Sequence, residues 1–264
     1  MSDTLNGATR VHFIVGDPIA QVKSPAGVTQ AFQDRGHNAI VVPAHVAPDN
    51  LIAWLAGTTL SQNVDGIIVT VPHKFAACDL CATTSERARF LSTVNTMRRN
   101  ADGRWHGDMF DGLGFVEAMR AQAIDPAGKK ALLVGAGGAG SAIAHALVMA
   151  GVSSLAIHDE SDARRASLVN RLNGLNGVPV QDGSADPTGC DIVLNATPIG
   201  MKDSDPTPID VTRLTPTMHV GCVITAPAIT PLIAAARAKG CTTQTGADMF
   251  ARVRDLMVNF LLGQ

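Results

Sequence analysis

Residues 132–140 of the chain read Leu-Leu-Val-Gly-Ala-Gly-Gly-Ala-Gly, and residues 141–147 continue Ser-Ala-Ile-Ala-His-Ala-Leu. The apolar run predicts a buried strand, and a G-x-G-x-x-G turn then leads directly into an apolar helix. One glycine allows the tight turn, one lets a pyrophosphate approach the backbone, and one lets helix and strand pack closely. The helix N-terminus adds unpaired N–H groups and a positive dipole end. The stretch therefore predicts a dinucleotide site made by Gly135, Ala136, Gly137, Gly138, Ala139 and Gly140.

An acidic residue is expected at the end of the next strand, about 20 residues further on, where it accepts hydrogen bonds from the ribose hydroxyls. Residues 154–158 read as that strand, and Asp159 follows 24 residues after Gly135 (159 − 135). A carboxylate there repels a 2′-phosphate, so the sequence predicts NAD, with NADP less favoured. Two alternatives stay open: Asp159 caps the helix over residues 164–172, and Arg164 and Arg165 reach a 2′-phosphate.

Composition sets the class of protein. The 264 residues are 46% hydrophobic and 17% charged, with a formal charge of −2, which is typical of a globular chain with one large or two ordinary domains. There is no basic stripe, so nucleic acid is not expected as a partner. Apolar runs are too short and glycine-broken to span a bilayer, and the N-terminus lacks the pattern of a signal peptide. We therefore expect no membrane partner and a cytoplasmic location.

The five cysteines are scattered, which predicts reduced thiols rather than a disulfide framework. Cys78 and Cys81 form a single C-x-x-C in a predicted helix. A structural zinc site needs four ligands, so no metal site is expected, and a redox role for the pair is the minor alternative.

The first half of the chain predicts an α/β domain. Ser24 and Pro25 are expected as N-cap and first residue of a helix that ends at Gly36. The other expected elements are strands at 11–16, 39–42, 64–71, 93–97 and 104–106, the last two forming a hairpin, and helices at 48–55 and 111–119. Thr70 and Lys74 follow the third strand, where ligands bind in open α/β sheets. Taken alone, Lys74 reads as a solvated lysine and Asp111 as a helix N-cap.

The second half alternates strands and helices, with strands at 131–134, 155–158, 191–195 and 219–224. Such alternation predicts a doubly wound parallel sheet. Asn195, Ala196 and Thr197 end one strand at its ligand-facing edge, and an amphipathic helix starts near Gly246. The fold class is therefore α/β, with a catalytic domain over 1–110, a Rossmann-type domain over 111–246 and a helix over 247–264 that packs back on the first domain.

These blocks resemble the shikimate dehydrogenase family over nearly the whole chain. The matching segments are Gly16-Asp17-Pro18-Ile19-Ala20 with Lys23-Ser24-Pro25, Val69-Thr70-Val71-Pro72-His73-Lys74, Val94-Asn95-Thr96, Gly107-Asp108 with Asp111-Gly112, the glycine turn, Asn195-Ala196-Thr197-Pro198 with Gly200-Met201, and Thr230-Pro231. Their order and spacing are far more specific than any one of them.

The resemblance implies an N-terminal substrate domain, a Rossmann domain and NAD(P)-dependent oxidation of a secondary alcohol of a shikimate- or quinate-like acid. It implies Lys74 as general base and Asp111 as the residue that orients it and holds the alcohol. Ser24, Thr70 and Asn95 would bind substrate. Val223, Gly246 and Met249 would line the nicotinamide end. The sequence does not distinguish a monomer from a homodimer.

Five positions depart from the family pattern. Val22 replaces a serine, Ile68 an asparagine, Phe110 a threonine, Thr225 a tyrosine and Val253 a glutamine. Each lost hydrogen bond to a buried polar ligand costs about 1–3 kcal/mol. The departures therefore favour, as an alternative, a paralogue that acts on a less hydroxylated acid with little shikimate activity. A non-catalytic NAD-binding regulator is a third possibility, although it would not need the Lys74–Asp111 pair.

Overall fold

The computed structural model describes residues 5–202 and 204–264. The chain divides into two compact units, Met1–Phe110 with Arg254–Gln264 (unit 1), and Asp111–Val253 (unit 2). The second boundary between the units lies between Val253 and Arg254, inside the last helix, α9 (Gly246–Leu261). The sequence suggests a boundary at 246/247, where this helix starts. The reason is local. A Cβ on Gly114 would lie 2.4 Å from the Val253 side chain, so only a glycine lets the first half of α9 pack in unit 2.

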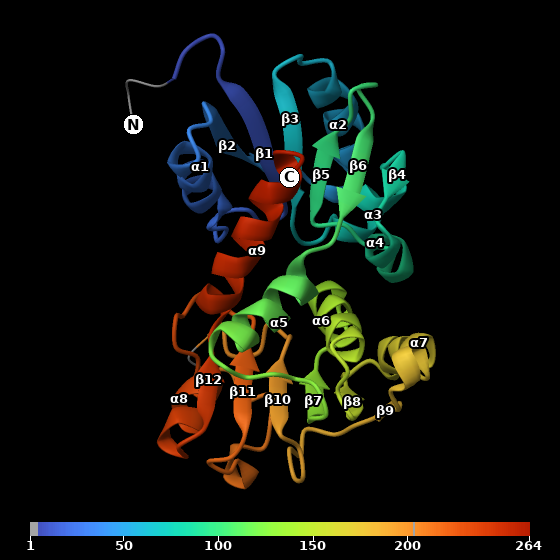
Figure 1. The fold of residues 1–264 in the computed structure, drawn as a ribbon, viewed down its shortest axis with the longest axis vertical. Helices are drawn as coiled ribbons and strands as arrows, with labels where there is room; N and C mark the ends of the chain where they lie inside the picture. Colours follow the sequence, from blue (N-terminus) through green and yellow to red (C-terminus); the bar gives the residue numbers. More distant parts are fainter. Residues whose placement is uncertain (1–4, 203) are drawn as a thin grey trace. The chain divides into compact units, whose positions relative to one another are not determined.

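Unit 1 is built on a mixed sheet in the order β2-β1-β3-β5-β6-β4 (Figure 1). β1, β2 and β3 are parallel, whereas β5 and β6 form an antiparallel pair that confirms the predicted hairpin. The helices and strands of unit 1 before α9 are β1 (Arg10–Gly16), α1 (Ser24–Asp34), β2 (Ala39–His45), α2 (Leu51–Thr59), β3 (Val64–Val69), α3 (Lys74–Asp79), β4 (Thr83–Thr84), α4 (Glu86–Leu91), β5 (Thr96–Arg99) and β6 (Trp105–Asp108).

Unit 2 is a six-stranded, fully parallel sheet in the order β12-β11-β10-β7-β8-β9, which confirms the doubly wound prediction. The chain runs outward from β7 through β8 to β9, then returns and runs from β10 the other way. The carboxyl ends of β7 and β10 therefore flank the position where the strand order reverses, at which such sheets bind ligands. The elements are α5 (Asp111–Ala121), β7 (Lys130–Val134), α6 (Gly138–Met149), β8 (Ser154–His158), α7 (Asp162–Leu172), β9 (Val180–Asp182), β10 (Ile192–Asn195), β11 (His219–Cys222), α8 (Pro231–Ala238) and β12 (Thr242–Gln244).

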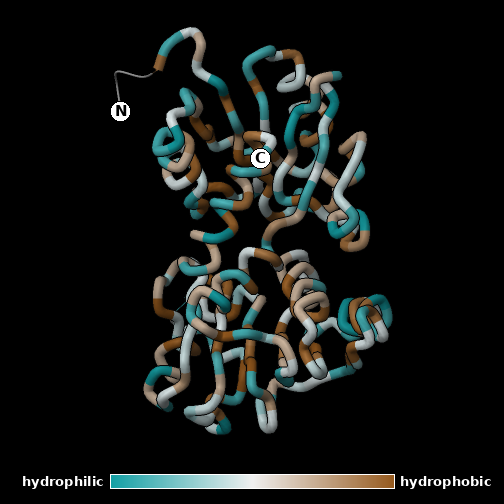
Figure 2. Tube along the Cα trace, in the orientation of Figure 1, coloured by the Kyte–Doolittle hydropathy of each residue, from teal (hydrophilic) through white to brown (hydrophobic). Residues whose placement is uncertain are grey.

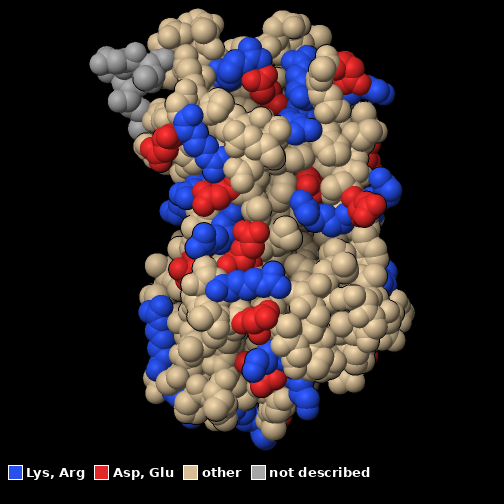
Figure 3. All heavy atoms as spheres, in the orientation of Figure 1, with Lys and Arg blue, Asp and Glu red and all other residues tan. Residues whose placement is uncertain are grey.

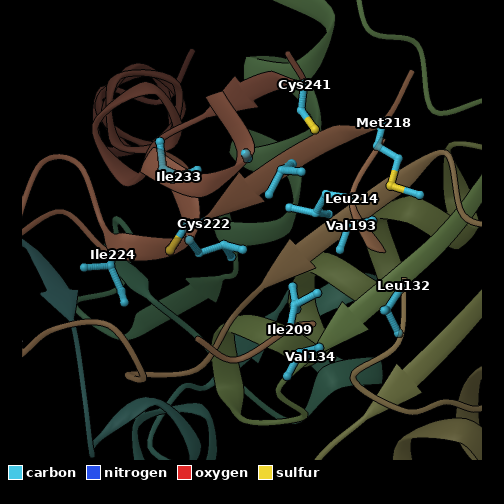
Figure 4. Packing of buried hydrophobic residues seen from close by; sticks show 13 residues of the cluster. Leu132, Val134, Val193, Ile209, Leu214, Met218, Cys222, Ile224, Ile233 and Cys241 are labelled. Atoms are coloured by element: carbon cyan, nitrogen blue, oxygen red, sulfur yellow. The ribbon is translucent and has the colours of Figure 1, made fainter. Parts of the chain in front are cut away.

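The core of unit 2 follows from near-continuous apolar strands. Leu132 of β7, Val193 of β10 and Val220 of β11 are each at most 1% exposed, and Figure 4 shows side chains from these strands meeting those of α8. Figure 2 shows the corresponding hydrophobic segments along the central strands. Strands buried on both faces are expected to be apolar throughout. This composition gives the parallel sheet its stability and leaves the polar residues at the strand ends.

Several local predictions are corrected. Ser24 is the first residue of α1 and not its cap: Lys23 holds the cap position and no side chain caps the helix. The helix expected over 48–55 is a 3₁₀ turn, Pro48–Asn50, followed by α2, which passes through Gly57. Cys81 lies beyond the end of α3. β11 ends at Cys222, two residues before the predicted end. Three short strands, β4, β9 and β12, were not expected, because each has only two or three residues.

Charged side chains of both signs are mixed over the face shown in Figure 3. Exposed ion pairs in unit 1 include Arg10 with Asp65 and Arg104 with Asp102. Within residues 5–202 and 204–264, no helix combines the length and apolar character that crossing a bilayer requires.

Two buried histidines make the fold sensitive to acid, one in each unit. His12 and His219 are each 2% exposed, and burial lowers the pKa of both from 6.5 to about 4. Between these values the unfolded chain binds more protons than the folded chain, so stability falls as the pH falls. We expect each histidine to cost about 2 kcal/mol of unfolding free energy on going from pH 7.5 to pH 5. Urea unfolding at the two pH values measures this.

His12→Phe keeps a ring in stacking position over Phe32, 4.6 Å away in the native protein. This variant should lose the acid sensitivity that His12 confers. The same replacement at exposed His37 is the matched control. An unchanged pH slope in His12→Phe would show that the buried ring does not carry the effect.

Candidate active site

The turn after β7 takes the form that its glycines predict. Gly135 has φ +108°, and a Cβ there would lie 2.8 Å from the carbonyl carbon of Ala196. A Cβ on Gly140 would lie 1.9 Å from the carbonyl oxygen of Gly135. Contacts this short admit no side chain, so Gly135 makes the tight turn and Gly140 the close approach of α6.

Gly137 differs from both because it faces open space. A Cβ built there meets nothing within 4 Å, and the φ of −74° is accessible to any residue. Gly137 is the N-cap of α6 and provides no side-chain cap. The first amides of α6 therefore start beside an open area, with the positive end of the helix dipole. This is the chemistry that the pyrophosphate of a dinucleotide requires.

Asp159 follows β8 and is 6% exposed. Its Oδ2 accepts a hydrogen bond from the N–H of Ala136 at 2.7 Å, and its Oδ1 accepts one from the N–H of Ser161 at 2.8 Å. The N-cap of α7 is Ser161, whose hydroxyl accepts the N–H of Arg164. The interpretation of Asp159 as the helix cap is therefore wrong. Its carboxylate instead ties the glycine turn to the end of β8.

Arg164 completes the surroundings of Asp159, with its Nη2 2.8 Å from Oδ1. Burial acts to raise the pKa of Asp159, but the hydrogen bonds from Ala136, Ser161 and Arg164 outweigh it and hold this pKa below its ordinary value. The side chain of Arg164 is 60% exposed. Arg165, by contrast, is 21% exposed and lies between Asp162 at 2.9 Å and Asp182 at 3.3 Å. Of the two arginines, Arg164 has the more exposed side chain.

The loop after β10 is shaped by Asn195, which is 1% exposed. Its Oδ1 accepts both the N–H and the hydroxyl of Thr197, at 3.0 and 2.7 Å, and its Nδ2 donates to the carbonyl of Ile199 at 3.2 Å. Ala196 donates its N–H to the carbonyl of Val134 at 2.7 Å, which fixes this loop beside the glycine turn. The hydrogen bonds of the buried Asn195 thus determine the conformation of the loop, and the partly exposed Ala196 and Thr197 lie at the loop surface.

The start of α9 lies close to the end of β11. A Cβ on Gly246 would lie 2.4 Å from the carbonyl oxygen of Ile224, so glycine is required there. Val223 donates its N–H to the carbonyl of Asn195 at 3.0 Å. Met249, in the first turn of α9, is 8% exposed. Val223, Gly246 and Asn195 therefore belong to one edge of the unit 2 sheet.

In unit 1, the end of β3 carries Thr70 and Lys74. Thr70 donates its N–H to the carbonyl of Val15 at 2.9 Å, and a Cβ on Gly16 would lie 2.4 Å from its side chain. Lys74 is the first residue of α3, and its carbonyl accepts the N–H of Val94 at 3.0 Å. The contacts of Thr70 with Val15 and Gly16 bring the residues after β1 and β3 to the same edge of the sheet.

His73 was not singled out from the sequence. It is 2% exposed, and its Nε2 lies 2.7 Å from the carbonyl oxygen of Val46, just after β2. The ring therefore attaches the turn before Lys74 to the neighbouring strand end. The signals in the sequence are its place beside Lys74 and its position in the family-matching segment over residues 69–74.

Asn95 and Ser24, the other expected substrate residues of unit 1, are 3% and 5% exposed. The Oδ1 of Asn95 accepts the N–H of Phe110 and the hydroxyl of Thr96, both at 3.1 Å. The side-chain oxygen of Asn95 therefore accepts a hydrogen bond from the backbone just before Asp111. The sequence did not suggest this role. Asp111 is the first residue of α5 and is 7% exposed.

The five cysteines, all within the described residues, are free thiols. Cys78 and Cys81 line a groove of about 400 Å³ together with Arg89 and Ser92. Burial raises the pKa of the Cys81 thiol to about 12 and also raises that of Cys78. Both remain protonated at neutral pH, which disfavours metal binding and nucleophilic chemistry. Among the residues that the structure covers, no group of three or more His, Cys, Asp or Glu side chains could hold a metal ion.

Comparison with known proteins identifies the family. Residues 14–97 match the shikimate dehydrogenase substrate-binding domain. A protein named shikimate dehydrogenase (NADP(+)) from Rubrobacter xylanophilus is 35% identical over 93% of this chain and 88% of its own length. The chain belongs to the shikimate dehydrogenase family. It is accordingly an oxidoreductase that uses a nicotinamide cofactor.

Solved members of the shikimate dehydrogenase fold agree. The shikimate 5-dehydrogenase of Listeria monocytogenes, in complex with shikimate and NAD, superposes with a TM-score of 0.90 at 25% identity, covering 100% of this chain and 95% of the other. The 5-ketofructose reductase of Gluconobacter sp. strain CHM43 superposes with a TM-score of 0.87 at 28% identity, covering 97% and 94%.

The three glycines give a test of the cofactor site. Gly137→Ala meets no atom, so it should fold with an unchanged melting temperature, but its methyl group would occupy the open space beside the α6 amides. We expect cofactor affinity to fall about tenfold or more, a loss of about 1.4 kcal/mol or more. Isothermal titration calorimetry with NAD and NADP measures it.

Gly140→Ala is the matched variant, because its methyl group would collide with the Gly135 carbonyl. It should lower the melting temperature itself. Wild-type cofactor affinity in Gly137→Ala would place the pyrophosphate elsewhere.

Proposed function

We propose that the protein catalyses reversible hydride transfer between a secondary alcohol of a shikimate- or quinate-like cyclic hydroxy acid and a nicotinamide cofactor. One observation carries the proposal. Lys74 and Asp111 are both present in a chain that is 35% identical to a protein named shikimate dehydrogenase over 93% of its length. A protein that only bound nucleotide would need neither residue, which argues against a non-catalytic regulator.

Lys74 is the proposed general base, whose Nζ takes the proton of the reacting hydroxyl, and the Asp111 carboxylate orients the lysine and the alcohol. The nicotinamide, when bound, supplies the hydride acceptor. Thr70, Asn95 and Ser24 are proposed to bind the ring substituents and carboxylate. His73 stabilises the turn from which Lys74 projects, through its bond to the Val46 carbonyl.

Lys74→Ala tests this assignment. We expect loss of about 10²-fold or more in kcat, typical of removing a positioned general base, with cofactor affinity unchanged. Initial rates of NAD and NADP reduction with shikimate and with quinate measure it. Lys23→Ala, at an exposed lysine of the same unit, is the control. Wild-type rates in Lys74→Ala would overturn the role of Lys74.

We further propose that NAD is preferred over NADP, with Asp159 as the residue responsible. Support comes from its buried, ionised carboxylate beside the glycine turn and from the acidic Glu160 that follows. Arg164 acts in the opposite direction, because its positive charge neutralises part of this negative charge and its side chain is 60% exposed. Relatives are named for NADP(+), whereas the Listeria structure contains NAD. The preference should therefore be small, set by the balance between Asp159 and Arg164.

Asp159→Ala removes the repulsion of a 2′-phosphate and releases Arg164. The ratio of NAD to NADP affinity should fall, with weaker NAD binding and stronger NADP binding. Calorimetric titration of both cofactors measures the ratio. Asp162→Ala, an 87% exposed acid beside Arg165, is the control, and unchanged affinities for both cofactors would mean that Asp159 only holds the turn.

A second candidate function is favoured by the buried apolar replacements. Ile68 and Phe110 are 3% and 4% exposed in unit 1, and Val253 is 5% exposed in unit 2. None of these side chains can donate or accept a hydrogen bond. An acid with fewer ring hydroxyls would therefore lose less binding free energy at these positions than shikimate would. The 5-ketofructose reductase neighbour shows that this fold also serves other substrates. A higher kcat/KM for shikimate or quinate than for acids lacking ring hydroxyls would exclude this candidate.

A further inference from the structure

Residues 109 and 110 join β6, which ends at Asp108, to Asp111, and they belong to unit 1. The N–H of Met109 donates to the Asp108 Oδ1 at 2.7 Å, and the N–H of Phe110 donates to the Asn95 Oδ1 at 3.1 Å. Both residues are buried, at 1% and 4% exposed, and buried amides require partners. Here the partners are side chains and not a neighbouring strand. Side chains therefore set the direction of the chain just before Asp111.

The Asp108 carboxylate is itself held from α4. Arg87 places its Nη2 2.6 Å from the Asp108 Oδ2, and the Ser85 hydroxyl donates to Oδ1. The Asp108 side chain is 8% exposed and that of Arg87 31%. Ser85 is also the N-cap of α4, where it accepts the N–H of Ala88 at 3.2 Å. Removing Arg87 would leave the buried Asp108 carboxylate without its charged partner, which is destabilising. The pair therefore holds α4 against the end of β6.

Arg87 contacts the same segment a second time. Its guanidinium carbon lies 4.9 Å from the centre of the Phe110 ring, and the Phe260 ring meets Phe110 edge-on at 5.3 Å. Phe260 is held by Arg98, which donates to its carbonyl at 3.2 Å and covers its ring at 5.0 Å. Both the backbone and the side chain of Phe110 are thus fixed within unit 1.

We propose that Arg87 and Asp108 are positioning residues for Asp111, acting through residues 109 and 110. The proposal rests on the proposed function, in which Asp111 is catalytic. Phe110 is joined to Asp111 by one peptide bond, so a change in chain direction at residues 109–110 changes the backbone conformation at Asp111. A misplacement of 1 Å can cost about 10²-fold in rate, whereas purely structural damage would lower stability without a selective effect on kcat.

Asp108→Asn keeps an acceptor for the Met109 amide but weakens the pair with Arg87. We expect kcat to fall about tenfold or more, with cofactor KM unchanged. Asp65→Asn is the matched control, since Asp65 pairs with Arg10 in the same unit, away from this segment. Arg87→Met should reproduce the loss, and Arg87→Lys, which keeps the charge, should restore part of it. Wild-type kcat in Asp108→Asn would overturn the proposal.

Hydrogen exchange measures the same effect without catalysis. In Asp108→Asn the amides of residues 109–112 should exchange faster, while those of β1 and β3 keep their wild-type protection. Unchanged exchange at 109–112, or faster exchange throughout unit 1, would overturn the proposal whatever the kcat. If the wild-type protein oxidises no hydroxy acid, the proposed function fails. The exchange measurement then decides alone whether Arg87 and Asp108 hold the backbone of residues 109–112.

Discussion

The nucleotide-binding half depends on how closely α6 approaches the turn after β7. No side chain fits at residue 140, because its first carbon would lie 1.9 Å from the Gly135 oxygen. This approach directs the α6 amides to the edge where β7, β8 and β10 end. Asp159 and Ala196 fix the turn from both sides, by bonds to the Ala136 amide and the Val134 carbonyl. One steric constraint therefore determines the position of several polar groups.

Much of this arrangement could be predicted from the sequence. The glycine spacing and the alternation of strands and helices specify a parallel sheet, and they place Asn195 and Thr197 correctly at a strand end. Both signals are local and periodic. The use made of individual side chains could not be predicted in this way. Asn95 and Asp159 are expected to bind ligands, and the structure adds that each also binds a backbone amide distant in sequence, Phe110 or Ala136. Such bonds depend on tertiary contacts that no periodicity encodes.

The starts of helices were harder to predict, because several residue types cap a helix equally well. The Ser-Pro pair predicted a serine cap, but the chain begins α1 one residue earlier, with Lys23 at the cap position. At α7 the sequence left a capping role for Asp159 as an open alternative, and Ser161 performs this role. Serine and aspartate both cap helices well, so local preference leaves them equivalent. Here the contact of Asp159 with the glycine turn decides between them.

Unit 1 is discontinuous in sequence, since residues 254–264 complete a sheet domain that begins before residue 110. Phe260, from this last segment, contacts both Phe110 and His106. During synthesis, every residue of unit 2 leaves the ribosome before the final residues of unit 1 do. The cofactor-binding unit can therefore be complete while the first unit still lacks Phe260. The part of the chain that is made first is the last to have all its contacts.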